Sequence, residues 1–440
     1  MLLTSYPFLF FFLPLALIIY FLLIEKNIGL KIYFLGFTSA YFYYLDNGLL
    51  IIILVFLALL TKIQIEKSIF SNFIYLCLIL SPLFIFKYSY HFFEMINIST
   101  PVLIENNFPI GLSFFTFQAI AYYFDQFRDE KKESFFDIFT FLAFFPQLLA
   151  GPIVNISTFR KGRGNLASKQ NLILGAHRLS LGLIKKFLLA DTLSEITSIF
   201  IYSNDNFELS IYSALIIVFS YTFQIYFDFS AYCDIAVGLG HFFGFKFPEN
   251  FEQPYTASSF RDFWRKWHIT LSNFFRDYVY IKLGGNRDSK LKTYRNLWVT
   301  FFCTALWHGS SINFLIWGFL HGFFMTFEKI LKYNKFVSNR FITFLLVSMT
   351  WVPFFSSDIE QTLLIYKSLF NFNLINDTIM PLLVQNFDIR LAIVSIVCLI
   401  TLIKNKKQFI PTFFSSILLL SFAILIVLSS SVDPFIYFKF

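Results

Sequence analysis

The stretch Tyr6-Pro-Phe-Leu-Phe-Phe-Phe-Leu-Pro-Leu-Ala-Leu-Ile-Ile-Tyr-Phe-Leu-Leu-Ile24 decides the fold class, because it holds nineteen residues without one charged side chain. A membrane-spanning helix needs about 20 mostly apolar residues. The rest of the chain has the same character: of 440 residues, 57% are hydrophobic and 14% are charged, against about 45–50% and about 25% in soluble domains. A water-soluble core is therefore excluded.

Further apolar runs predict an all-α, polytopic transmembrane bundle, because they show little of the two-residue alternation of a membrane barrel. The predicted runs are 6–24, 30–45, 48–63, 70–90, 108–124, 135–153, 170–190, 209–227, 312–330, 341–357, 388–403 and 412–430. Short or proline-interrupted runs, such as 144–146 and Ser81-Pro82, indicate kinked or re-entrant helices, so we expect about eleven real spans. No polar stretch is long enough to form a second domain. We therefore expect residues 1–440 to form one domain around a central funnel.

The positive-inside rule predicts the orientation of the chain in a bacterial inner membrane. Lys26 and Lys31 follow the first run and no basic residue precedes it, which favours a retained first helix with its N-terminus outside. The basic block Arg261–Arg295 is expected in the cytoplasm; its nine basic and three acidic residues supply +6 of the net charge of +8. The final residues 433–440 are then expected at the outer face. We expect contact with the lipid bilayer and no nucleic-acid partner.

The cysteines give no sign of a disulfide framework or a metal site. Each of the four lies inside an apolar run, without a CxxC pair or a histidine at ligand spacing: Cys77, Cys233, Cys303 and Cys398. Disulfides and structural zinc are therefore not expected.

The segment 260–278 predicts an amphipathic helix along the membrane surface. Apolar residues recur at 260, 264, 267, 271, 274 and 278, which lie on one helix face. Trp264 and Trp267 are expected at headgroup depth, with Arg261, Arg265, Lys266 and Arg276 toward water. One interpretation is an anchor that binds anionic lipid. The other is a catalytic role for His268, on the border of the apolar face.

His308 is the histidine for which the sequence makes the best functional case. The run Thr293–Trp307 has 15 residues, roughly 22 Å of helix against about 30 Å of hydrocarbon, so it should end within the bilayer. Gly309 suits a helix end, and Ser310, Ser311 and Asn313 suit the start of the next helix. An ionisable residue at such a break is a candidate for function. The alternative is a structural histidine bonded between helices.

Other polar residues in apolar runs favour structural interpretations. These are His91, His177, His241 and His321, each expected to bond a neighbouring group. The glycines between Gly238 and Gly244 lack the spacing of a phosphate loop, so they predict close helix packing. Asp228 and Asp234 are either a cation site or, more simply, helix caps or partners of Arg178.

Five strings resemble the membrane-bound O-acyltransferase family, within it the alginate and peptidoglycan O-acetyltransferases. They are FFPQLLAGPI at 144–153, YFDFSAYCDIAVGLG at 226–240, FRDFWRKWHITLS at 260–272, RDYVYIKLGGNR at 276–287 and ALWHG at 305–309. They occur in the family's order within a core of about 105–325. The resemblance implies a catalytic role for His308, with His268 as second histidine. It also implies that the tail 433–440 carries a tyrosine, Tyr437, that holds the acyl group briefly.

The resemblance further implies acetyl-CoA as the donor and an outer-face polysaccharide as the acceptor, reached through an SGNH-type transferase partner. The phosphates of CoA cannot enter hydrocarbon cheaply, so we expect the nucleotide to stay at the basic face. Its candidate contacts are Arg265, Lys266, Arg276, Lys282 and Arg287. His308 is expected to act as general base on Tyr437 or on a sugar hydroxyl, with His268 positioning a group or stabilising charge. D-alanyl transfer, lipid O-acylation and transport or flipping of a substrate remain open alternatives.

Overall fold

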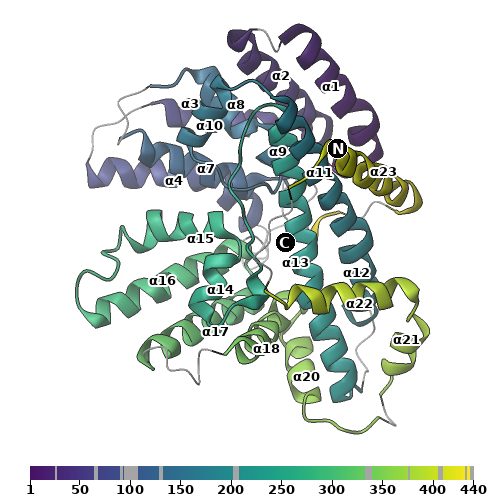
Figure 1. Ribbon diagram of the computed structural model, residues 1–440. Coiled ribbons are helices and arrows are strands. Elements are labelled where there is room, and N and C mark those ends of the chain that lie inside the picture. Colours follow the sequence, from purple (N-terminus) through teal and green to yellow (C-terminus); the bar gives the residue numbers. More distant parts are fainter. Residues whose placement is uncertain are drawn as a thin grey trace. The chain divides into compact units, whose positions relative to one another are not determined.

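The computed structural model describes residues 1–24, 27–63, 68–89, 93, 108–127, 132–201, 208–331, 339–374, 377–404, 410–431 and 434–436. Regular secondary structure within these ranges is helical throughout, which confirms the all-α prediction (Figure 1). Two compact units are formed. Unit 1 comprises Met1–Gly182, Tyr232–Glu249 and Pro411–Ile424, and unit 2 comprises Leu183–Ala231, Asn250–Ile410 and Leu425–Phe440.

Unit 1 is built mainly from the N-terminal helices. They are η1 (Phe8–Phe12), α1 (Leu13–Ile19), η2 (Tyr20–Ile24), α2 (Ile28–Asn47), η3 (Gly48–Leu50), α3 (Ile51–Lys62), α4 (Ile69–Lys87), α7 (Leu112–Asp125), α8 (Phe135–Ala143), α9 (Phe145–Leu148), α10 (Ile156–Gly164) and α11 (Lys169–Ile184). The predicted interruption near Pro146 is confirmed, since Phe144 leaves the helical conformation between α8 and α9. Pro82, in contrast, lies inside α4 without ending it.

Unit 2 carries the basic block Arg261–Arg295 and most of the remaining helices. They are η4 (Lys185–Ala190), α12 (Asp191–Ile201), η5 (Pro254–Thr256), α14 (Phe260–Lys266), α15 (Ile269–Phe275), η6 (Arg276–Tyr280), α16 (Lys290–His308), α17 (Ile312–Ile330), α18 (Arg340–Thr350), α19 (Val352–Phe355), α20 (Ile359–Ser368), α21 (Met380–Gln385) and α22 (Ile389–Thr401). Two more helices, α13 (Ile211–Phe242) and α23 (Phe413–Ser429), contribute residues to both units.

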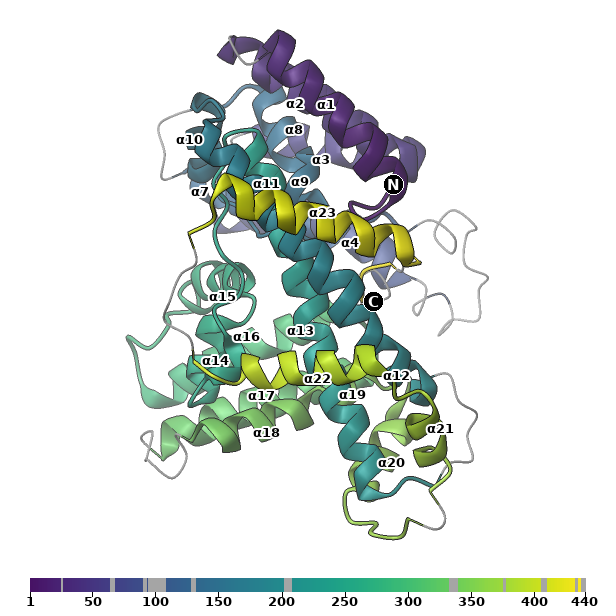
Figure 2. The same ribbon diagram turned by 45° about the vertical axis from the view of Figure 1, so that its right-hand side comes forward.

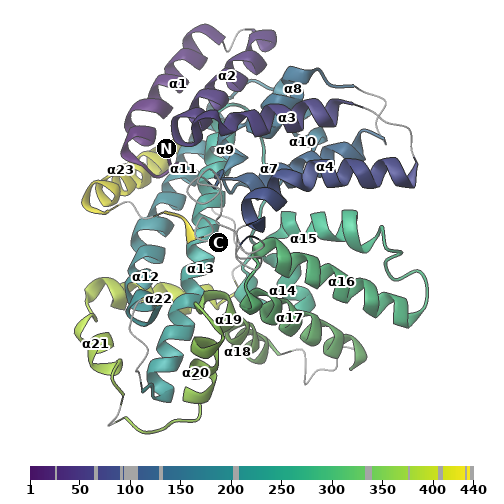
Figure 3. The same cartoon turned by 180° about the vertical axis from the view of Figure 1, so that it is seen from behind.

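Helix α17 organises the part of unit 2 that holds the histidines. It lies against α16 along much of its length and also contacts α14, α18 and α19 (Figure 3). Elsewhere in the unit, α22 packs on α12 (Figure 2). Helix α17 therefore connects α16 to α14, α18 and α19.

Every predicted apolar run coincides with one or more helices, and α17 has the predicted bounds 312–330. Within the described residues, three helical segments are long and apolar enough to cross a membrane: Gly29–Lys62, Phe70–Lys87 and Ile211–Phe242. Four shorter apolar segments join them, namely Phe8–Ile24, Arg340–Phe355, Ile389–Thr401 and Phe413–Ser429. Large apolar side chains stay exposed on these helices, as expected for faces that meet lipid. The number of eleven spans stays a prediction.

Gly238 provides the close helix contact that the sequence predicts. A Cβ atom at this position would lie 2.7 Å from the Leu179 backbone nitrogen and 2.8 Å from the Gly175 carbonyl oxygen. Both of these atoms belong to the backbone of α11 and cannot move aside as a side chain does. Glycine therefore lets α11 and α13 approach within unit 1, and the phosphate-loop interpretation is not needed.

We expect Gly238→Ala to lower the free energy of unfolding by about 1–3 kcal/mol, the usual cost of overpacking. Gly164→Ala is the matched control, because a Cβ there meets no atom within 4 Å. Thermal unfolding of the detergent-solubilised variants measures the difference. Equal melting temperatures for the two variants would show that the approach of the helices does not depend on Gly238.

Candidate active site

Asn250 shapes the chain around His268. Its side-chain oxygen accepts hydrogen bonds from the Thr270 backbone N–H (3.0 Å) and the Thr270 hydroxyl (2.9 Å), and lies 3.3 Å from His268 Nδ1. Its backbone carbonyl accepts from the Ile269 N–H at 3.0 Å. His268 adopts the left-handed conformation, with φ of 41°, and α14 therefore ends before it and α15 begins after it.

This turn corrects the prediction of one continuous surface helix over 260–278. The chain forms α14, α15 and the π-helix η6 instead. Trp267, expected at headgroup depth, is 2% exposed and packs against Trp351 and Phe251, with ring centroids 4.9 and 5.0 Å away. His268 is 1% exposed, not at the border of a wet face. The apolar side chains of this segment therefore pack against other aromatic side chains of unit 2, such as Trp351 and Phe251.

His308 is the last residue of α16 and lies in an enclosure of aromatic rings. Its ring centroid is 4.5 Å from Trp307, 4.8 Å from Trp317, 4.9 Å from Phe354 and 6.1 Å from Phe314. The imidazole is 5% exposed. The predicted helix break is therefore confirmed, and the structure buries its histidine among aromatic rings.

The turn after His308 depends on its neighbours in sequence, as predicted. A Cβ atom on Gly309 would lie 2.4 Å from the Phe314 ring, so only glycine allows that ring to close over the helix end. Ser311 is the N-cap of α17, where its hydroxyl accepts from the Asn313 N–H at 3.3 Å. Asn313 in turn donates to the Ser356 carbonyl at 2.9 Å. These contacts fix the direction in which α17 leaves the site.

His321 and Trp317 are both buried near His308, but they differ in whether their ring nitrogens have hydrogen-bond partners. His321 Nδ1 accepts from the Trp264 indole at 3.3 Å, and its Nε2 lies 3.0 Å from the Thr350 hydroxyl. The structural interpretation of His321 is therefore confirmed. The Trp317 indole N–H is buried and meets no acceptor within the described residues, so it remains a donor that a bound oxygen can use.

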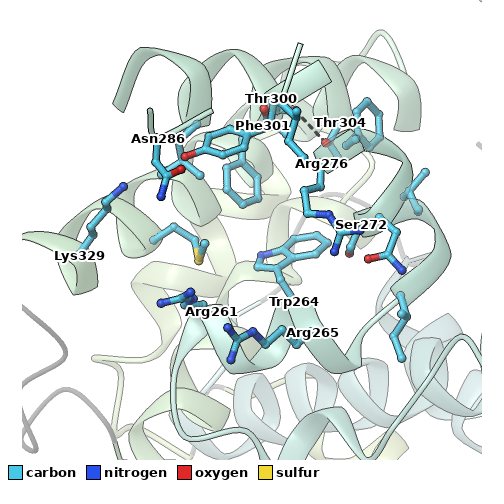
Figure 4. A pocket seen from close by; sticks show the side chains of 18 residues that line it. Arg261, Trp264, Arg265, Ser272, Arg276, Asn286, Thr300, Phe301, Thr304 and Lys329 are labelled. Atoms are coloured by element: carbon cyan, nitrogen blue, oxygen red, sulfur yellow. Dashed lines mark hydrogen bonds between the residues drawn. The ribbon is translucent and has the colours of Figure 1, made fainter. Parts of the chain in front are cut away.

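A cavity of about 660 Å³ opens beside Trp264, the residue that donates to His321. Its lining combines basic, polar and apolar side chains: Arg261, Trp264, Arg265, Ile269, Leu271, Ser272, Asn273, Phe275, Arg276, Tyr280, Ile281, Asn286, Leu297, Thr300, Phe301, Thr304, Met325 and Lys329. Figure 4 shows Arg261, Arg265 and Arg276 arranged around the Trp264 indole, with Lys329 and Asn286 on the far side from Arg276. Four cationic side chains therefore share one cavity.

The five basic residues predicted to contact a nucleotide are divided by the structure. Arg265 and Arg276 line the cavity. Lys266 binds Asp262 at 2.9 Å on the same helix, and Lys282 and Arg287 are exposed and outside the lining. Two cations of the lining were not among the predicted nucleotide contacts: Arg261 was expected to face water, and Lys329 lies in a different helix, 34 residues beyond the basic block.

Helix geometry links the cavity to His308, although the histidine is not itself one of the lining residues. Leu297, Phe301 and Thr304 line the cavity, and His308 follows at the next position of the same 4-3-4 spacing. Residues at this spacing share one face of a helix. Four residues correspond to about 6 Å along the axis, so His308 lies one turn beyond the cavity wall.

The two aspartates of α13 each have a cation of their own. Asp234 binds Arg178 at 2.6 Å, as predicted, and Arg178 also binds Glu249 at 2.7 Å. Asp228 binds Lys186 at 2.9 Å, a partner that was not predicted. Pairing therefore replaces the alternative of a shared cation site. Two further predicted positions, His91 and Tyr437, lie outside the described residues, and no disulfide joins any two of the four cysteines.

Comparison with known proteins adds an independent line of evidence. Residues 71–355 match the profile of the membrane-bound O-acyltransferase family. A probable alginate O-acetylase of Pseudomonas syringae pv. tomato is 40% identical over 273 residues, which cover 60% of this chain and 52% of the relative. The peptidoglycan O-acetyltransferase of Helicobacter pylori is 33% identical over 399 residues, or 76% and 74% of the two chains.

A more distant relative is the teichoic acid D-alanyltransferase of Bacillus subtilis, 29% identical over 262 residues, which cover 55% of this chain and 65% of the relative. The chain spans about half the length of the alginate relatives it matches. All five strings singled out in the sequence fall within the matched range 71–355.

Burial gives His268 a measurable signature, because it lowers the pKa of this histidine to about 3. An unfolded chain binds the proton below about pH 6.5, whereas the folded protein does not. Above about pH 6.5, the neutral ring of the folded protein therefore costs no stability. Below that pH, the free energy of unfolding falls by about 1.4 kcal/mol per pH unit.

We expect His268→Asn, which tolerates the left-handed backbone, to show a smaller drop in melting temperature between pH 7 and pH 4.5. Equal drops for the two proteins would contradict a neutral buried His268.

Proposed function

Since the chain belongs to the membrane-bound O-acyltransferase family, we propose that it transfers an acetyl group from acetyl-CoA toward a polysaccharide outside the inner membrane. The observation that carries this proposal is the cavity with four cationic side chains, one helical turn from His308. Such a cavity suits a donor with several phosphate charges at one end and a small thioester at the other.

The basic residues bind the nucleotide end of the donor. Arg265 precedes the turn at His268 and Arg276 follows it, and both line the cavity. Arg261 and Lys329 are the other two basic residues of the lining. Phosphate oxygens form strong, charge-assisted hydrogen bonds with guanidinium groups. Trp264 offers an apolar face between these cations. The thioester is then free to extend along α16 toward His308.

His308 acts as general base in the transfer. It takes the proton of an attacking hydroxyl, whose oxygen forms an ester bond to the acetyl carbonyl carbon. The carbon–sulfur bond of the thioester breaks, and the CoA thiolate leaves with the proton that the imidazole received. The Trp317 N–H is a donor for the negative charge on the carbonyl oxygen during this step.

The hydroxyl that attacks first is that of Tyr437 in the C-terminal tail. An SGNH-type partner at the outer face then takes the acetyl group from this tyrosine ester and passes it to the sugar. CoA stays on the cytoplasmic side, which avoids moving its phosphates through hydrocarbon. Alginate and peptidoglycan are acceptors of named relatives, and both are candidate acceptors here.

Family membership favours acyl transfer over transport or flipping. Two enzyme alternatives follow from the family: D-alanyl transfer, by analogy with the Bacillus relative, and O-acylation of a lipid. Purified protein supplied with acetyl-CoA, long-chain acyl-CoA or a D-alanyl donor separates them, because only the true donor yields acylated product. Release of free CoA thiol separates the acyl-CoA-dependent enzymes from a transporter. No thiol release from acetyl-CoA with acceptor and partner present would refute the proposal.

We expect His308→Ala to lower CoA thiol release at least about a hundredfold, because the general base is removed. His177→Gln is the control: this histidine lies in α11 of unit 1 and is expected to leave turnover near that of the wild type. The rate of thiol appearance with a chromogenic disulfide measures both variants. Near-normal turnover of His308→Ala would reduce this histidine to a structural role.

We expect Arg265→Gln and Arg276→Gln each to raise KM for acetyl-CoA about tenfold with kcat little changed, because one charge-assisted contact to a phosphate is lost. Arg295→Gln is the matched control; this exposed arginine bonds Asn296 and is not part of the lining. Steady-state kinetics give both constants. If all three variants keep the wild-type KM, the nucleotide does not bind in this cavity.

A further inference from the structure

A cluster of three charged side chains in unit 2 is not used by the chemistry above. Lys186, in η4, lies 2.8 Å from Asp191 and 2.9 Å from Asp228. The side chains of Lys186 and Asp228 are 6% and 3% exposed. Buried charges are costly unless paired and hydrogen-bonded. A cluster of this kind therefore needs further polar partners nearby.

The last described residues of the chain supply these partners. The Ile436 backbone N–H donates to Asp228 Oδ2 at 2.7 Å, and the Lys186 ammonium group donates to the Pro434 carbonyl at 3.4 Å. These contacts join positions 208 and 248 residues apart in the sequence. The carboxylate and the ammonium group thus each bind the main chain of the segment 434–436, one at its end and one at its start.

The side chains of this segment are buried as well. Phe435 is 2% exposed and Ile436 is 8% exposed. The Phe435 ring lies 5.5 Å from Phe229, which is the residue after Asp228 on α13. One helix position therefore supplies the polar contact to the segment, and the next supplies the apolar one.

A continuous series of ring contacts leads from this segment to the candidate base. Phe229 lies 4.6 Å from His268, His268 lies 6.1 Å from Trp307, and Trp307 lies 4.5 Å from His308, all between ring centroids. The segment 434–436 is thus packed against the same side-chain cluster that holds both histidines. The next residue along the chain is Tyr437.

We propose that Asp228 and Lys186 are positioning residues that hold the C-terminal segment 434–436 by its main chain, and so set the point from which Tyr437 enters the reaction. The inference rests on the proposed function, because it takes Tyr437 as the first acetyl acceptor. Holding the main chain leaves the side chain that follows free to react. It also reduces the number of orientations from which the reacting group approaches its target, which is the usual benefit of orientation in catalysis.

Accessibility of the segment tests the contact without any assay of activity. In a protein whose four native cysteines are serine, Ile436→Cys places a thiol at a buried position and keeps the backbone N–H that Asp228 accepts. We expect Asp228→Ala to increase the rate of labelling by a water-soluble maleimide about tenfold or more, since a charged hydrogen bond is lost. Asp234→Ala is the matched control: it removes a buried, ion-paired aspartate from the same helix, but one that binds Arg178.

Acetylation of Tyr437, measured by mass spectrometry of intact protein with labelled acetyl-CoA, tests the consequence. We expect Asp228→Ala to slow labelling at saturating acetyl-CoA about tenfold with KM unchanged, Asp234→Ala to remain near the wild-type rate, and Tyr437→Phe to abolish the label. Equal maleimide rates in the two aspartate variants would overturn the positioning role. Absence of label at Tyr437 in the wild type would refute the tyrosine relay instead, and the maleimide rates would still decide whether Asp228 holds the segment.

Discussion

The site depends on the hydrogen bonds that Asn250 makes to the chain at 269–270. They hold His268 in a left-handed conformation and divide one basic stretch into α14 and α15. On a straight helix, Arg265 and Arg276 would lie about 16 Å apart along the axis. The turn at His268 interrupts the helix between them, and both arginines line one cavity. The contacts of one residue, Asn250, thus divide a linear basic segment into two helices that both contribute to one cavity.

The sequence predicts most of the apolar face of this segment, but not which part of the protein covers it. The 4-3-4-3-4 spacing singles out six residues, of which Phe260, Trp267, Leu271 and Phe274 are buried, whereas Trp264 and Tyr278 are half-buried. It also predicts one uninterrupted helix, which is wrong, since the chain forms α14, α15 and η6. The break depends on Asn250, 18 residues before His268 in the sequence, and periodicity within the segment contains no information about a partner at that distance.

Other parts of the site could be predicted because their causes are local. The end of α16 and the start of α17 follow from Gly309 and Ser311, which act on their immediate neighbours. The all-α class follows from composition and the length of the apolar runs. The cavity could not be predicted in this way, since Lys329 and Asn286 join it from separate segments. The contact of Asp228 with residues 434–436 joins the middle of the chain to its end, which again no local pattern encodes.

The two buried aspartates of α13 allow this one helix to hold two separate ion pairs. Asp228 and Asp234 are six residues apart on α13, which places them about 120° apart around its axis, so they cannot face a common ion. Each binds a separate cation, Lys186 in unit 2 and Arg178 in unit 1. Four basic side chains of unit 2 instead line the cavity; of these, Arg276 also pairs with Asp277 at 2.7 Å, whereas Arg265 has no acidic partner within the described residues. Buried basic groups that pair with the aspartates of α13 support the fold, whereas a cavity with a basic lining suits an anionic ligand. An apolar enclosure at His308 beside such a cavity suits a substrate with a charged end and a small neutral reactive end.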